Sequence, residues 1–110
     1  MNLTQKKCVA CEGGMPPLKG ELLKKYLGQV EGWQLVDSAK IKKEFTFKDF
    51  KEALAFVNKV GDIAESEQHH PDIHLVSYKK VIIELFTHAI EGLSENDFIV
   101  AAKINSIWSS

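Results

Sequence analysis

The chain has no long apolar run, no excess of charge of one sign and only two cysteines. No stretch approaches the roughly 20 apolar residues that a membrane-spanning helix needs. The first seven residues, MNLTQKK, lack the apolar centre of a secretory signal. With a formal net charge of −1 and scattered lysine pairs, no basic patch for direct nucleic-acid binding stands out. These absences predict a cytoplasmic protein that contacts neither membrane nor nucleic acid directly.

The two cysteines, Cys8 and Cys11, form a C-x-x-C pair, but no second pair completes the four ligands of a closed zinc site. A redox pair of this spacing is expected before a βαβ unit, whereas this one precedes Gly13-Gly14-Met15-Pro16-Pro17. A metal or redox role is the less favoured alternative. We expect residues 1–17 to form a reduced, mobile N-terminal arm and residues 18–110 to form a single domain.

Periodicity predicts both helices and strands. Apolar residues at helical spacing predict three helices, over about 18–27, 47–68 and 94–108. Alternation predicts four strands, over about 33–37, 41–47, 73–78 and 81–87, with a turn at Lys79-Lys80 between the last two. The order α-β-β-α-β-β-α, with hairpin-joined strand pairs, predicts an α+β fold. In it, helices pack on one face of a four-stranded antiparallel sheet.

Capping signals mark the ends of two of these helices. Thr46 with Asp49 resembles a capping box, so the second helix is expected to start near residue 47 or 48. Pro71 disfavours helical backbone at the residue before it, which ends that helix by about residue 68 or 69. Ser94 and Asp97 form a stronger capping box before the third helix, and this role is the simplest explanation of Asp97.

Histidines are concentrated at one predicted corner of the fold. His69-His70-Pro71 lies where the second helix ends, and His88 ends the fourth strand. If strands three and four form a hairpin, their outer ends are neighbours, and the three imidazoles converge. Histidine can both give and take a proton near neutral pH. The convergence therefore predicts proton transfer at this corner.

Other readings of these histidines remain open. Histidines at the end of a surface helix interact favourably with the helix dipole without any further function. A metal site from His69, His70, His88 and Glu65 is a further alternative, although no H-x-H or H-E-x-x-H pattern supports it. Glu65 lies one helical turn before His69 and is expected to orient its ring or hold its proton. His74 is expected to be a non-catalytic strand residue.

Together these residues give the chain a resemblance to the pterin-4a-carbinolamine dehydratase family. The resemblance covers roughly residues 18–108, and its C-x-x-C arm is similar to that of many bacterial members. It rests on Gly32-Trp33, Phe45-Thr46-Phe47-Lys48-Asp49-Phe50, Glu65-x-x-x-His69-His70-Pro71, Tyr78, Thr87-His88, Gly92-Leu93-Ser94 and Asp97. The segment from Pro71 to Tyr78 is at the longer end of the family's range.

The resemblance implies an activity and a set of residue roles. The reaction is dehydration of a 4a-hydroxytetrahydropterin to a quinonoid dihydropterin, in tetrahydrobiopterin-type recycling and without a metal or organic cofactor. His69, His70 and His88 are the implied catalytic residues. His69 and His88 would transfer protons and His70 would mainly hold the pterin, with Pro71 and Thr87 at the rim.

The resemblance also implies partners and supporting groups. Glu65 and Asp97 flank the site and are expected to support the histidines. Family members form homodimers or homotetramers, so we expect a homo-oligomer. Some members act as dimerisation cofactors for a homeodomain transcription factor, and such a binding function is the alternative to catalysis.

Overall fold

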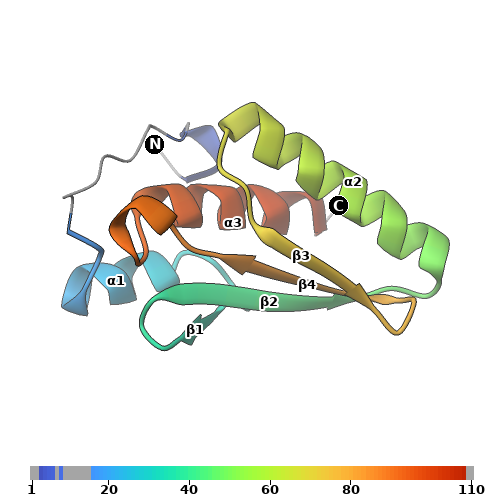
Figure 1. Ribbon diagram of the computed structural model, residues 1–110, viewed down its shortest axis with the longest axis horizontal. Coiled ribbons are helices and arrows are strands. Elements are labelled where there is room, and N and C mark those ends of the chain that lie inside the picture. The colour runs from blue at the N-terminus through green and yellow to red at the C-terminus, as the bar shows by residue number, and fades with distance from the viewer. Residues whose placement is uncertain (1–2, 7, 9–15, 109–110) are drawn as a thin grey trace.

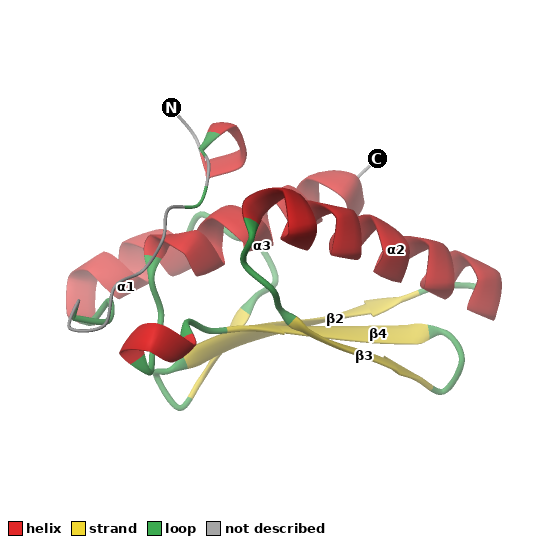
Figure 2. Cartoon of the chain, turned by 45° about the horizontal axis from the view of Figure 1, so that its top comes forward, coloured by secondary structure: helices red, strands yellow, loops and turns green. Residues whose placement is uncertain are grey.

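The computed structural model describes residues 3–6, 8 and 16–108. Its elements are, in chain order, η1 (Leu3–Gln5), α1 (Gly20–Leu27), β1 (Gln34–Val36), β2 (Lys40–Thr46), α2 (Phe50–Glu67), β3 (Asp72–Val76), β4 (Lys80–Leu85), η2 (His88–Ile90) and α3 (Glu95–Trp108) (Figure 1). The four strands of this part of the chain form one antiparallel sheet in the order β1-β2-β4-β3. Figure 2 shows the helices on one side of this sheet. The predicted α+β fold is confirmed.

The two faces of the sheet differ because strand side chains alternate. In β2, Ile41 and Phe45 are buried beneath the helices. Lys42 and Glu44, which lie between them in the strand, are exposed. In β4 the apolar residues at alternate positions are likewise fully buried, and they pack with α2 and α3 in one core. The opposite face of the sheet carries charged side chains, so the helix side is where buried polar groups have to be held.

The start of α2 differs from the sequence expectation. The helix begins at Phe50, and Asp49 is its N-cap, accepting a hydrogen bond from the Glu52 amide at 2.8 Å. The predicted Thr46–Asp49 capping box is therefore wrong, because Asp49 is itself the cap. The end of α2 is as predicted: the last helical residue is Glu67, and Gln68 adopts a left-handed conformation with φ of 53°.

The hairpin between β3 and β4 also turns earlier than predicted. Ser77 and Tyr78 both have positive φ, of 50° and 53°, and Val76 pairs with Lys80 across the hairpin. Lys80 is thus the first residue of β4, so the predicted turn at Lys79-Lys80 is wrong. Neither Ser77 nor Tyr78 is a glycine, so the usual sequence signal for such a turn is absent here.

Beyond β4 the chain makes a short closed loop. The strand ends at Leu85, so the predicted strand end at residue 87 is wrong, and His88 is the first residue of η2. Thr87 and Gly92 form an isolated antiparallel bridge, with the Thr87 amide 2.8 Å from the Gly92 oxygen and the Gly92 amide 3.3 Å from the Thr87 oxygen. The bridge encloses residues 88–91 and returns the chain to the start of α3.

The described part of the N-terminal arm packs on the domain. Leu3 is buried in the hydrophobic core, and η1 contacts α3. The Cys8 amide donates to Glu67 Oε1 at 2.8 Å. The expectation of a mobile arm is therefore wrong for residues 3–6 and 8, because burial of Leu3 and these polar contacts hold them in place. Cys11 lies outside the described residues, and the domain boundary near residue 17 stays a prediction.

Candidate active site

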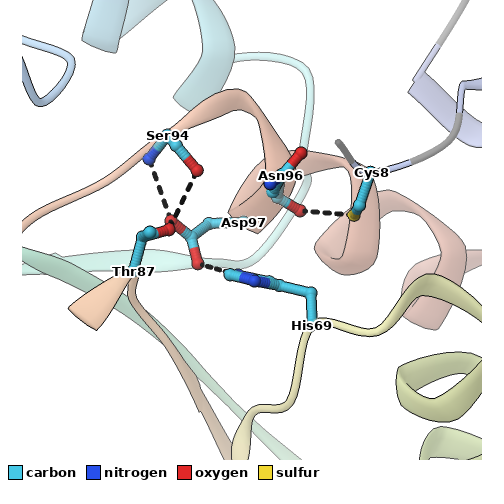
Figure 3. A network of polar contacts seen from close by, with 6 residues as sticks. All are labelled: Cys8, His69, Thr87, Ser94, Asn96 and Asp97. Carbon is cyan, nitrogen blue, oxygen red and sulfur yellow. Dashed lines mark hydrogen bonds and ion pairs between the residues drawn. The ribbon is translucent and has the colours of Figure 1, made fainter. Parts of the chain in front are cut away.

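His69 lies at the corner between α2 and β3. The left-handed Gln68 turns the chain out of the helix, and the His69 amide donates to the Ala64 oxygen at 3.2 Å. The His69 side chain is mostly buried, and its Nε2 atom lies 2.7 Å from Asp97 Oδ1 (Figure 3). The His69 side chain is thereby held against α3, while the His69 backbone forms part of the corner between α2 and β3.

Asp97 is the centre of the polar network in Figure 3. Its Oδ2 atom accepts hydrogen bonds from the Thr87 hydroxyl at 2.8 Å and from the Ser94 amide at 2.9 Å. The Thr87 and Ser94 hydroxyl oxygens lie 2.9 Å apart. The predicted capping role of Asp97 is confirmed by the bond from Ser94. The same buried carboxylate also binds His69, so capping accounts for only part of its contacts.

The network joins the two segments that the sequence places at neighbouring strand ends. Asp72 at the start of β3 pairs with Glu84 near the end of β4, so the segments that carry His69 and Thr87 leave the sheet at neighbouring strand ends. Asp97 bonds to both side chains. The structure therefore brings the His69 corner beside Thr87-His88. Thr87, expected only at the rim, is buried with its hydroxyl directed at Asp97.

His88 and His70 have other surroundings. Thr87 has an extended backbone, and its side chain points to Asp97, whereas His88 begins η2. The His88 ring is exposed and lies 4.1 Å from the Phe86 ring, centroid to centroid. His70 is exposed, and its Nε2 atom contacts Glu65 Oε2. The expected pairing of Glu65 with His69 is wrong, because the corner after Gln68 directs His70 toward that carboxylate.

His74 lies away from this site. It is in β3, on the sheet face opposite the helices, and its Nε2 atom is 3.0 Å from Glu84 Oε2. Glu84 also binds Lys40 across the sheet, and the Lys40 ammonium holds the pKa of Glu84 below its ordinary value. This position agrees with the expectation that His74 is a strand residue outside the site.

Two polar residues near the site were missed from the sequence. Ser94 was assigned only a cap, although its hydroxyl is part of the buried network. Glu67 was not singled out, yet it is buried beside Lys103. Glu67 does carry a sequence signal: it extends the buried stripe of α2 that runs through Ala53, Phe56, Val60 and Ala64. A carboxylate at the end of an apolar stripe needs a partner.

Within the described residues, no group of three or more His, Cys, Asp and Glu side chains is arranged to hold a metal ion. None of the helices described has both the length and the apolar character needed to cross a lipid bilayer.

Comparison with known proteins shows the family to which this chain belongs. A sequence model of the family described as "Pterin 4 alpha carbinolamine dehydratase" matches residues 16–107. The chain belongs to the pterin-4a-carbinolamine dehydratase family. Relatives named for this family include a protein of Rubrobacter xylanophilus, 48% identical over 105 residues (96% of this chain, 97% of the relative). One of Alkaliphilus metalliredigens is 50% identical over 105 residues (94% of each).

One solved structure gives the same family and fold, and a second gives the same fold. The crystal structure titled as a transcriptional coactivator/pterin dehydratase from Brucella melitensis has a TM-score of 0.78 and 34% identity, covering 84% of this chain and 98% of that one. A pterin dehydratase-like protein described as a RuBisCO assembly factor of the alpha-carboxysome has a TM-score of 0.61 at 21% identity, covering 73% and 93%. The second likeness is one of fold alone.

Proposed function

We propose that this protein dehydrates a 4a-hydroxytetrahydropterin to the quinonoid dihydropterin. In this reaction the C4a–O bond breaks, the N5–H proton is removed, a C4a=N5 double bond forms and water leaves. The chemistry needs a proton donor for the departing hydroxyl and an acceptor for the N5 proton, and two histidines suffice. The observation that carries the proposal is the mostly buried His69 imidazole held by Asp97 at 2.7 Å, beside Thr87-His88.

The geometry supports a base role for His69. Asp97 receives hydrogen bonds from Thr87 and Ser94 on Oδ2, and its Oδ1 atom faces His69 Nε2. A carboxylate accepts hydrogen bonds, so this pairing favours the tautomer that carries the proton on Nε2. The lone pair of that tautomer is on Nδ1. We propose that Nδ1 takes the N5 proton, while Asp97 stabilises the imidazolium that forms.

The remaining residues are assigned around this pair. We propose that His88, on the loop after Thr87, donates the proton with which the C4a hydroxyl leaves as water. His70, exposed beside Glu65, would bind the pterin. Pro71 would form the rim of the site beside His70, and Thr87 would hold Asp97 beneath it.

Stopped-flow absorbance tests the proposal. A 4a-hydroxytetrahydropterin is generated chemically, and its dehydration is followed with and without the protein, before and after exhaustive chelation. The expected result is acceleration that survives chelation. Equal rates with and without protein would contradict the dehydratase, and loss of acceleration restored by zinc would revive the metal-site reading.

A binding function is the second candidate. The Brucella relative carries the coactivator description in its title, and α2 exposes Phe50 and Leu54, four residues apart on one face. We propose that this protein acts in the cytoplasm. We also propose that it is a homodimer or homotetramer, because exposed apolar faces and open sheet edges favour association. Light scattering at micromolar concentration should give a multiple of the chain mass. A monomer mass would contradict it.

A further inference from the structure

A buried ion pair lies next to the His69 corner of the proposed site. Glu67, the last residue of α2, has a side chain only 4% exposed, and its Oε2 atom contacts the ammonium of Lys103 in α3. The pair joins the end of α2 to α3. Desolvation makes such a pair costly unless each oxygen is satisfied, and here Glu67 Oε1 accepts a second bond, from the Cys8 amide at 2.8 Å.

The N-terminal arm contacts the same two helices. Besides its amide bond to Glu67, Cys8 directs its thiol at the Asn96 oxygen, 3.6 Å away. Lys6 is 2.8 Å from Glu95, which also accepts from Tyr26. Glu95 and Asn96 immediately precede Asp97 in the first turn of α3. The arm therefore holds both the residue before the His69 corner and the turn that carries Asp97.

The pKa of the Cys8 thiol reflects its burial and the charges near it. Burial first, and then the Glu67 carboxylate, raise the pKa of Cys8 to about 12. Lys103 acts in the opposite direction, and Asp97 adds to the rise. The same thiol is thus influenced by the Glu67–Lys103 ion pair and by the carboxylate partner of His69.

We propose that Glu67 is a positioning residue of the dehydratase, holding the α2 corner at the distance from α3 at which His69 bonds to Asp97. Only Gln68, in its left-handed conformation, separates Glu67 from His69. A shift of Glu67 relative to Lys103 therefore moves the imidazole relative to Asp97. Misplacement of a catalytic group by about 1 Å can cost on the order of 100-fold in rate. The inference rests on the proposed function.

Two variants and a matched control test the inference. Glu67→Gln keeps the side-chain shape but removes the charge, and Lys103→Gln leaves the carboxylate in place and alters a residue nearer the surface. The control is Glu84→Gln, which also removes a carboxylate bound by a lysine, on the sheet face away from the site. All are assayed at a temperature where each variant is folded. Glu67→Gln should lower kcat roughly tenfold with KM within about twofold, Lys103→Gln should do so less, and Glu84→Gln should leave kcat unchanged.

A second measurement does not depend on turnover. Long-range proton–nitrogen NMR of the His69 imidazole should show one tautomer, protonated on Nε2, in the parent protein. Glu67→Gln should give a mixture of tautomers, and Glu84→Gln should not. If Glu67→Gln and Lys103→Gln leave both kcat and the His69 signals unchanged, or change KM alone, the positioning role is refuted. If the parent protein is inactive, the proposed function fails, while the His69 signals still decide whether Glu67 orients that ring.

Discussion

His69 and His70 are neighbours in the chain, and each pairs with a carboxylate, yet their environments are opposite. The side chains of His69 and Asp97 are 13% and 0% exposed, whereas those of His70 and Glu65 are 61% and 78% exposed. Asp97 is further held by Thr87 and Ser94. The pairing of an imidazole with a carboxylate thus occurs once as a fixed buried contact and once as a surface contact.

The difference teaches which pair can carry precise chemistry. An exposed ion pair contributes roughly 0–1 kcal/mol and is screened by salt, so it does little to fix a ring. A buried carboxylate that accepts several hydrogen bonds has one orientation, and it imposes that orientation on the imidazole bound to it. The predictions below use the exposed pair as the reference for the buried one.

The largest expected effect is loss of a proton-transfer group. His69→Ala should lower kcat by about two to four orders of magnitude, the usual worth of a positioned acid or base. His88→Ala should do the same, because we propose His88 as the proton donor. Steady-state or single-turnover dehydration kinetics measure both. A His69→Ala variant that keeps more than a tenth of the parental kcat would place the base elsewhere.

Replacing the two carboxylates compares the pairs directly. Asp97→Asn keeps the shape but no longer favours the Nε2-protonated tautomer of His69, so kcat should fall roughly 100-fold. Glu65→Gln should change kcat by no more than about twofold, because its contact is exposed. Equal losses in the two variants would show that burial does not distinguish the pairs.

His70→Ala should act mainly on binding. Its ring is exposed beside the corner, so its removal should raise KM by about tenfold while kcat changes little, because about 1.4 kcal/mol of contact corresponds to a factor of ten. Full saturation curves separate the two constants. His74→Ala, on the far sheet face, is the matched control and should change neither. Loss of turnover in the control would contradict the placement of the site.

The smallest expected effect is a pH dependence of stability at Glu95. Hydrogen bonds from Lys6, and then from Tyr26, hold the pKa of Glu95 below its ordinary value. Its stabilising contribution is therefore present above the ordinary carboxyl range and lost as pH falls through the lowered pKa. Denaturant unfolding should show Glu95→Gln less stable than the parent near pH 7, with the difference shrinking below about pH 4. A constant difference would contradict this coupling.

The fold was largely predictable because its signals are local. Alternation in β2 and β4 and the apolar stripe of α2 each depend on residues a few positions apart, and they specify an antiparallel sheet with helices on one face. The turn at Ser77-Tyr78 was misplaced because it uses left-handed backbone without glycine. The start of α2 was misplaced because Thr46 and Asp49 are both residues that can cap a helix. The structure uses the second of them, three residues further along the chain.

The site was only partly predictable because its contacts are long-range. Spacing along the chain suggested that Glu65 would hold His69, but the left-handed Gln68 rotates the corner and gives that contact to His70. The partner of His69 is Asp97, 28 positions away. Such pairing depends on how α2 and α3 pack, which periodicity does not describe. The burial of Leu3 against α3 was missed for the same reason.

The Thr87–Gly92 bridge has a consequence for how the site can diverge among relatives. Its two hydrogen bonds close residues 88–91 at their base, so the length and sequence of that loop can change without displacing Thr87 or Ser94. His69, Thr87 and Asp97 contact one another outside this loop. We expect insertions and substitutions in residues 89–91 to alter which pterin side chain is accommodated, while His88 and the buried network are retained.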